Sequence, residues 1–339
     1  MANIMINEVC NLNCSYCFAN EYVNNKECFR EHSGNMTFEN FKKAVEFTLK
    51  GSKQIRILGG EPTLHPEFKK MINYVVNDNR VDYVHIFTNG LILDKYEELI
   101  KNDKVTFMIN LNSPNDISKK NYDKTIKNIE ALIKMGKRRK TVLGINMYKE
   151  DFDYEYILEA LQKFEFKTVR TSICVPNEET NSDVGTLVYF FSMKPRVLEF
   201  FNKLQKIGVM PTYDCNIMPT CVTTPLEKDR LSKLYDFEKE VNYYCNVNDC
   251  SNCGATLDIL TDLSIVRCFG LSREKKIKID DFDHPAEAAD YFHKEYDKYA
   301  YDVVADNTCI NCNLRLEKKC MGGCLAFKVK EINKLKKGE

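Results

Sequence analysis

The sequence predicts an α/β protein, a partial (β/α)6 barrel followed by a smaller, cysteine-rich domain. Three observations support this prediction. Short β-branched runs alternate six times with helical patterns, the alternation stops near Gly208, and ten of the 15 cysteines lie beyond that residue. The predicted domains are therefore residues 1–208 and 209–339. Because periodicity does not show whether a sheet closes, an open doubly wound sheet is the alternative.

Six apolar runs are predicted to be strands because they are short and rich in β-branched residues. They are Ile4–Val9, Gln54–Leu58, Tyr83–Phe87, Val105–Leu111, Val142–Met147 and Val169–Val175. Repeated strand-helix-strand units give parallel strands with right-handed crossovers. The carboxyl ends of parallel strands share one edge of the sheet, so we expect ligands to bind there.

The helices between these strands carry boundary signals. Thr37 is predicted to cap the first helix at its start, and Gly51, Gly136 and Gly208 are predicted to end three of the helices, the first helix among them. The last helix-like stretch is Pro195–Ile207. Beyond it, little regular pattern is visible.

Composition excludes several classes of function. Lys plus Arg and Asp plus Glu both number 49, so the chain lacks the basic field that nucleic-acid binding usually needs. No apolar run approaches the roughly eighteen residues of a membrane span, and Glu8 and Cys10 come too early for a signal peptide. We therefore expect a cytoplasmic protein with no nucleic-acid or membrane partner. In that reducing compartment, the cysteines favour metal binding or catalysis over disulfides.

Three cysteines follow the first predicted strand, in Cys10-Asn-Leu-Asn-Cys14-Ser-Tyr-Cys17. A loop with three thiolates can bind three irons of a 4Fe-4S cluster and leave the fourth iron open to a small molecule. That arrangement indicates catalysis. Zinc is the alternative, but a structural zinc site needs four ligands, and the next candidates, Cys28 and His32, lie at unremarkable spacing.

This segment resembles the signature of the radical S-adenosylmethionine (radical SAM) enzymes, CxxxCx-aromatic-C, which Cys10, Cys14, Tyr16 and Cys17 match. Gly59-Gly60-Glu61 follows the second predicted strand, where that family carries a GGE motif for the amino group of S-adenosylmethionine (SAM). The glycines would let the backbone approach the ligand, and Glu61 would offer a carboxylate to the ammonium.

The resemblance implies further cofactor contacts at the other strand ends. Asn112 and Ser113 would bond the ribose, Gly144 would let the adenine lie against the backbone, and Arg170 would meet the carboxylate. Ordinary polarity of a loop or strand is the alternative for each. The implied chemistry is reductive cleavage of SAM at the open iron, which yields methionine and a 5′-deoxyadenosyl radical that abstracts hydrogen from a substrate. An electron donor such as flavodoxin or ferredoxin would supply the electron.

Cys174 lies near the end of the sixth predicted strand. It belongs neither to the first cysteine group nor to the group of cysteines beyond Gly208. One interpretation is a small buried residue, since unligated cysteine is among the most buried residue types. The other is a catalytic thiol that returns a hydrogen atom to the substrate radical, as in an epimerisation. Cys28 is the other free thiol that could do this.

The downstream cysteines look like the SPASM extension, which binds auxiliary 4Fe-4S clusters and is frequent in peptide-modifying enzymes. Its core is matched by Cys253, Cys268, Cys309, Cys312, Cys320 and Cys324. Cys215 and Cys221 would complete the eight thiolates of two clusters, with Cys245 and Cys250 as alternates. A single auxiliary cluster with unused thiols is the competing interpretation, and in isolation the final group also resembles a zinc ribbon.

The chain departs from the SPASM pattern at three points. Leu263 stands where the pattern has glycine, and seven residues separate Cys312 from Cys320 in place of five. The pattern also usually ends with a further cysteine, whereas only a Lys-rich tail follows Cys324. Cluster membership therefore stays open.

Three functional hypotheses follow. The first is a radical SAM enzyme that crosslinks, epimerises or oxidises a ribosomally made peptide, and the second is one that modifies a sugar, nucleotide or other small molecule. The third is a non-catalytic iron-sulfur electron carrier or zinc-stapled interaction protein, against which the GGE motif argues. Because the first cluster motif starts at Cys10, we expect no preceding leader-recognition domain, which weakens the peptide hypothesis. Phe269 follows Cys268 where sulfatase-maturating relatives have an acid, so that activity is disfavoured.

Overall fold

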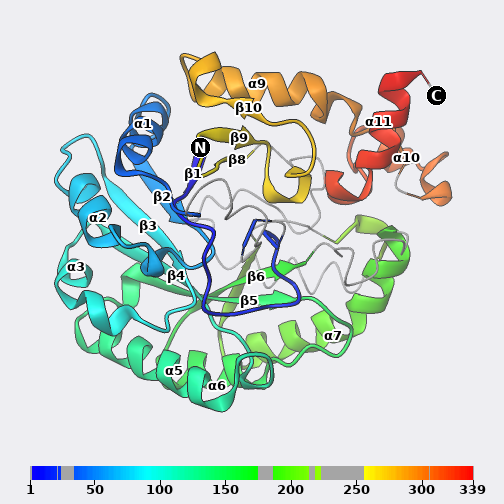
Figure 1. Ribbon diagram of the computed structural model, residues 1–339. Coiled ribbons are helices and arrows are strands. Elements are labelled where there is room, and N and C mark those ends of the chain that lie inside the picture. The colour runs from blue at the N-terminus through cyan, green and yellow to red at the C-terminus, as the bar shows by residue number, and fades with distance from the viewer. Residues whose placement is uncertain are drawn as a thin grey trace. The chain divides into compact units, whose positions relative to one another are not determined.

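The computed structural model describes residues 2–20, 22–23, 34–174, 186–213, 218–222, 256–304 and 306–338. The chain forms two compact units, residues 1–143 with 255–292 and residues 144–254 with 293–339. Figure 1 shows the ribbon coloured from blue at the N-terminus to red at the C-terminus. Within the described ranges, no helix is long and apolar enough to cross a membrane.

The first unit is built on a mostly parallel sheet. Its strands are β1 (Ala2–Met5), β2 (Gln54–Leu58), β3 (Tyr83–Thr88), β4 (Val105–Asn110), β8 (Leu257–Ile259), β9 (Ser264–Val266) and β10 (Ile277–Lys278). Their order is β10-β9-β8-β1-β2-β3-β4. The strands from β8 to β4 run parallel, whereas β9 pairs antiparallel with both β8 and β10. The predicted strand Ile4–Val9 ends early, at Met5, because the backbone from Asn7 onward bonds to Gly60 and Glu61 beyond the end of β2.

Helices follow the strands of this unit, and all but the last of them lie between parallel strands in the chain. They are α1 (Phe38–Leu49), α2 (Phe68–Val76), α3 (Glu97–Lys101), α4 (Pro114–Ile117), α5 (Lys119–Lys134) and α9 (Pro285–Glu295), whose last residues belong to the second unit. The N-cap of α1 is confirmed, because the Asn40 N–H donates to Thr37 Oγ1 at 3.1 Å. Gly136 follows α5 with φ +77°, the left-handed conformation that glycine adopts without penalty. Gly51 does not adopt the left-handed conformation. The C-cap of α1 is Lys50, which has right-handed helical geometry.

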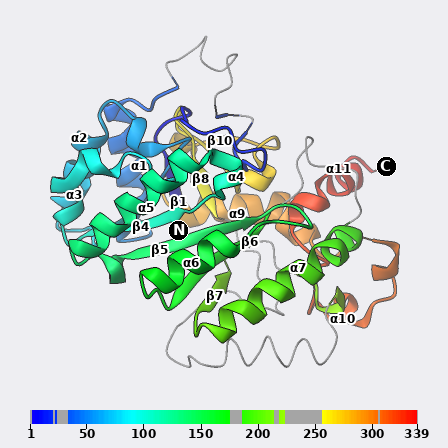
Figure 2. The ribbon, with the colours of Figure 1, turned by 90° about the horizontal axis from the view of Figure 1, so that it is seen from below.

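The second unit holds the remaining strand-helix units. Its strands are β5 (Thr141–Met147), which begins in the first unit, β6 (Thr168–Ile173) and β7 (Met210–Tyr213), in that order. Its helices are α6 (Glu155–Lys163), α7 (Thr186–Lys206), α10 (Asn313–Leu316) and α11 (Val329–Lys337). β7 runs parallel to β6 and lies against α7 (Figure 2). α7 begins nine residues before the predicted start at Pro195, because Phe190 and Met193 continue its buried face across the proline. Gly208 follows it with φ +66°.

The path of residues 256–292 differs most from the predicted organisation. β8 pairs with β1 so that Asn3 lies opposite Asp258, and the Asn3 amide donates to the Asp258 carboxylate at 2.6 Å. At the end of the same strand pair, the Thr261 hydroxyl donates to Glu8. Packing thus places these strands beside β1 in the first unit. The predicted division into functional domains at residue 208 stays a prediction.

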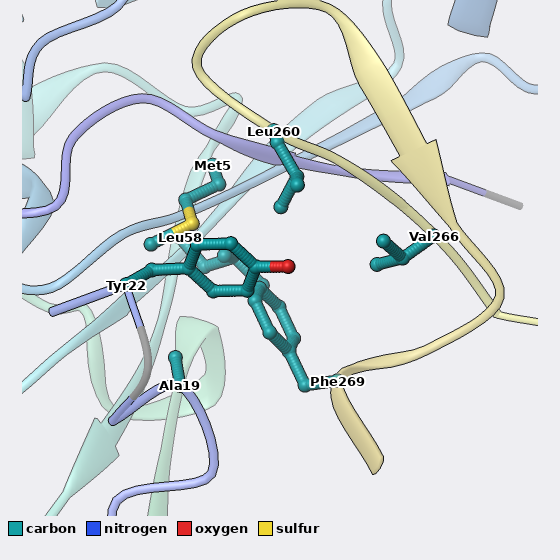
Figure 3. Close-up of a cluster of buried hydrophobic side chains, with 7 residues drawn as sticks. All are labelled: Met5, Ala19, Tyr22, Leu58, Leu260, Val266 and Phe269. Atoms are coloured by element: carbon teal, nitrogen blue, oxygen red, sulfur yellow. The ribbon is translucent and has the colours of Figure 1, made fainter. Parts of the chain in front are cut away.

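An apolar cluster joins the segment after Cys17 to the segment after β9 (Figure 3). Its members are Met5, Ala19, Tyr22, Leu58, Leu260, Val266 and Phe269. Cys17 itself packs against this cluster. The ring of Phe269 meets that of Phe18 edge to face, with centroids 4.8 Å apart, and the Tyr22 hydroxyl donates to the Ser272 carbonyl at 3.0 Å. Burial of the Tyr22 and Phe269 rings therefore anchors the loop that carries the first three cysteines.

Phe269→Ala is expected to lower the free energy of unfolding of the first unit by about 3 kcal/mol, because it leaves a cavity in this cluster. Phe18→Ala is the matched control, since the Phe18 side chain is 56% exposed, and it should cost less than about 1 kcal/mol. Denaturant titration of both variants measures the difference. Equal losses would contradict the anchoring role of Phe269.

Candidate functional site

The first cysteine group lies on the loop that follows β1. Cys10, Cys14 and Cys17 are each partly exposed, and the Cys17 N–H donates to the Cys14 carbonyl at 3.1 Å in a tight turn. Burial, with a smaller contribution from neighbouring acidic groups, raises the pKa of Cys10 to about 12 and that of Cys14 to about 11. The thiols therefore hold their protons until a metal displaces them.

The donor set of this loop fits an iron-sulfur cluster. Three thiols of one short loop supply the ligand type that such clusters need, and the Leu12 N–H points to the Cys10 sulfur at 3.4 Å, a contact that tunes ligated thiolates. Among the described residues, no three His, Cys, Asp or Glu side chains converge on a point that suits one metal ion.

The two glycines after β2 pack directly against this loop. The Gly60 N–H donates to the Asn7 carbonyl and the Glu61 N–H to the Val9 carbonyl, both at 2.8 Å. A Cβ on Gly59 would lie 2.1 Å from Asn7 Oδ1, and one on Gly60 would lie 2.4 Å from the Val9 carbonyl oxygen. No side chain fits at either position. In this structure the glycines admit the backbone of Asn7 to Val9. Their predicted contact with a ligand stays a prediction.

The Glu61 carboxylate is surrounded by hydrogen-bond donors. It is 1% exposed and accepts from the Thr63 hydroxyl at 2.5 Å, the Thr88 hydroxyl at 2.7 Å and the Asn89 N–H at 2.7 Å. Burial raises its pKa, although these hydrogen bonds oppose the shift. Glu61 therefore joins the ends of β2 and β3. Its predicted contact with a cofactor ammonium stays a prediction.

Polar side chains at the ends of β3 and β4 hold the cysteine loop from the other side. The Asn89 amide donates to Asn11 Oδ1 at 2.7 Å, and the Tyr16 hydroxyl donates to Asn112 Oδ1 at 2.5 Å. Ser113 caps α4, its hydroxyl accepting from the Asn115 N–H at 3.2 Å. Sequence reasoning missed Asn11 and Asn89, although a polar residue directly after a parallel strand was the available signal.

Three other predicted residues lie in the second unit. Gly144 is part of β5, and the Arg170 guanidinium of β6 donates to Asn146 Oδ1 at 2.7 Å. Cys174 directly follows β6 and is partly exposed, its N–H donates to the Met147 carbonyl at 2.9 Å, and its carbonyl accepts from the Tyr189 hydroxyl. The backbone at Cys174 is therefore fixed from two sides.

A second group of thiols surrounds a cavity in the second unit. Cys221, Cys309, Cys312 and Cys320 line it, together with Arg315 and apolar side chains. Partial burial, and to a smaller extent the neighbouring thiols, raise the pKa of Cys221; Cys320 has the largest electrostatic effect, and Cys309 and Cys312 have smaller ones. The Gly322 N–H points to the Cys320 sulfur at 3.3 Å. Cys324 does not line this cavity.

The remaining predicted ligands are divided between the first unit and undescribed positions. Cys268 follows β9 in the first unit, where the Arg267 guanidinium approaches its sulfur at 3.6 Å. Cys28, Cys215, Cys245, Cys250 and Cys253 lie outside the described residues. Leu263, which replaces the expected glycine, has φ +64° in the turn between β8 and β9. Leu263 therefore adopts the left-handed backbone conformation that glycine would favour.

Comparison with known proteins identifies the first half of the chain. Residues 4–164 match the radical SAM superfamily. The radical SAM cyclopropyl synthase TigE of Paramaledivibacter caminithermalis is 28% identical over 169 residues, which cover 44% of this chain and 36% of TigE. A probable GTP 3′,8-cyclase of Methanococcus maripaludis is 31% identical over 142 residues, covering 39% of this chain and 45% of that protein. The chain thus spans less than half the length of these relatives.

The fold is similar to solved structures of Streptococcus suis SuiB. The structure of SuiB bound to S-adenosylmethionine has a TM-score of 0.60 and 17% identity, covering 97% of this chain and 73% of SuiB. The structure of SuiB bound to precursor peptide SuiA has a TM-score of 0.61 and 16% identity, covering 97% and 72%. The likeness confirms the predicted α/β fold with its cysteine-rich region.

Gly60→Ala is expected to remove the first cluster, because its Cβ would displace Val9 and the adjoining Cys10. After anaerobic reconstitution, the variant should bind about four fewer irons per chain than the wild type. Gly51→Ala is the control, since its Cβ would meet its nearest neighbours at an ordinary 3.4 Å. Unchanged iron content in Gly60→Ala would show that the loop does not need this close contact.

Proposed function

We propose that this chain, whose residues 4–164 belong to the radical SAM superfamily, crosslinks, epimerises or oxidises a ribosomally made peptide. The observation that carries the proposal is the likeness to SuiB, which extends over 97% of the chain and so includes the cysteine-rich part. SuiB has been solved with a precursor peptide bound. The peptide substrate is inferred from that shared fold.

In this proposal Cys10, Cys14 and Cys17 bind the cluster that cleaves SAM, and the bound cofactors supply a 5′-deoxyadenosyl radical that abstracts hydrogen. The protein itself holds the cluster-binding loop in a fixed position. Gly59 and Gly60 fix the loop, and Glu61 with its donors fixes the strand ends beneath it. A loop held in place before the ligand arrives loses little freedom on binding.

The same proposal assigns SAM contacts to side chains at the strand ends. Asn112 and Ser113 would face the ribose, and the existing Tyr16–Asn112 hydrogen bond would hold the amide in position. Gly144 would accommodate the adenine. Arg170 would meet the carboxylate, with Asn146 orienting its guanidinium.

Modification of a nucleotide or other small molecule is the second candidate. The relative named as a probable GTP 3′,8-cyclase favours it, but that likeness covers 39% of this chain, against 97% for SuiB. For either substrate we propose flavodoxin or ferredoxin as the electron donor. We propose a cytoplasmic setting, in which the cysteines stay reduced and available as ligands.

The peptide proposal is tested by co-expressing the enzyme with each short reading frame that flanks its gene and measuring peptide masses. The wild type should change the mass of one peptide, and Cys14→Ala should change none. The same variant should form no 5′-deoxyadenosine from SAM, since a cluster with two protein thiolates does not present the open iron. If purified enzyme cleaves SAM but alters no peptide, the small-molecule candidate replaces the peptide.

We also propose that Cys174 donates a hydrogen atom to the substrate radical, because it lies at the carboxyl end of β6 with its backbone fixed. The thiyl radical that this step leaves on Cys174 would return to the thiol by taking one electron from the flavodoxin or ferredoxin donor and one proton from solvent. Turnover in deuterated water should then place one deuterium in the product through exchange at the thiol. Cys174→Ala should still form 5′-deoxyadenosine but no altered product. A product two hydrogens lighter, formed equally well by Cys174→Ala, would instead establish oxidative bond formation.

A further inference from the structure

We propose that Cys221, Cys309, Cys312 and Cys320 together bind one auxiliary 4Fe-4S cluster, and that Lys328 and Arg315 compensate its negative charge. The assignment rests on the proposed function only in that the chain binds iron-sulfur clusters. It does not depend on the substrate. Because four thiolates complete the ligation of a cubane, no iron of this cluster is left open to a substrate thiolate.

The geometry of the cavity supports this set of four. Cys309 and Cys312 flank one short turn, Cys320 follows α10, and Cys221 comes from a separate segment before them in the chain. All four line a single cavity, whereas Cys324 does not, although it lies only four residues beyond Cys320. The thiols surround a space and do not converge on one point within the described residues. That arrangement suits a cluster with a ligand at each corner better than one zinc ion.

Lys328 is a buried cation beside this cavity. It is 1% exposed, and its ammonium donates to the carbonyls of Ala300, Val303 at 3.3 Å and Met321 at 2.5 Å. No carboxylate pairs with it in the described part of the chain. Burial lowers its pKa to about 8, while the thiolates of Cys320, Cys309 and Cys324 oppose that shift. A buried ammonium without a carboxylate costs free energy that a nearby anion offsets.

Arg315 is a second cation on the cavity wall. Its guanidinium donates to the carbonyls of Cys309 at 2.8 Å, Tyr301 at 2.6 Å and Ile310 at 2.7 Å. It therefore shapes the turn that carries Cys309 and also places a positive charge beside the thiols. Lys328 likewise holds the backbone at Met321, the residue after Cys320, through the hydrogen bond that its ammonium donates to the Met321 carbonyl. Both residues are positioning residues for the ligands.

Two fixed cations beside a cluster have a measurable consequence. Reduction adds an electron to a group that is already negative, so nearby positive charge stabilises the reduced form and raises the reduction potential. Lys328→Met should therefore lower the midpoint potential of this cluster, and Lys328→Arg should restore most of it. Lys330→Met, at an exposed lysine two residues along α11, is the matched control and should change it little.

The ligand set is tested in protein with Cys10, Cys14 and Cys17 replaced by alanine, so that the first cluster contributes no signal. After anaerobic reconstitution, iron is assayed and the electron paramagnetic resonance of the reduced protein is followed against potential. Cys221→Ser should alter or remove one signal, the same one whose potential Lys328→Met lowers. Because Cys221 is exposed, its replacement should not impair folding.

Cys324→Ser should leave that signal and its potential unchanged. Loss of the signal in Cys324→Ser, or its persistence unaltered in Cys221→Ser, would overturn the assignment. Equal potentials in Lys328→Met and Lys330→Met would overturn the role of Lys328. None of these readouts involves substrate, so the assignment can fail while the peptide proposal stands, and the reverse.

Discussion

The contact between the backbone of Gly59 and Gly60 and the backbone of Asn7 to Val9 is the constraint on which the first site depends. The Gly60 N–H donates to the Asn7 carbonyl across this contact, the adjoining Glu61 N–H donates to the Val9 carbonyl, both at 2.8 Å, and the space between the two segments admits no Cβ. The cysteine loop starts one residue later. Its position is therefore decided by main-chain packing, and the polar contacts made by Glu61 and Asn89 only complete what that packing begins.

The two thiol groups differ in the segments that supply the sulfurs and in the side chains that hold those segments in place. In the first unit, one loop supplies all three sulfurs, and neutral donors such as Tyr16 and Asn89 fasten it. In the second unit, separate segments supply the sulfurs, and the cations Lys328 and Arg315 fasten the chain between them. For the two clusters proposed above, neutral donors around the first would leave its potential low, whereas the cations beside the second would raise its potential and favour an electron acceptor.

Local patterns in the sequence were enough to predict much of this arrangement. The spacing of Cys10, Cys14 and Cys17, the GGE motif and the strand β2 all involve residues close together in the chain. The pairing of β8 with β1 was not predictable in this way, since it joins residues 255 positions apart and depends on tertiary packing. Lys328 was also missed, because a lysine among other lysines indicates a solvated tail, and only the fold shows that it is buried.

The pairing of β1 with both β2 and β8 has a consequence for biosynthesis. β1 is made long before β8, so one of its edges lacks its β8 partner until Asp258 has left the ribosome. At the usual rates of translation, the intervening 255 residues take roughly 10 to 50 s. During that interval the nascent chain presents an open, apolar strand edge, the kind of surface that chaperones bind and that otherwise pairs with other chains.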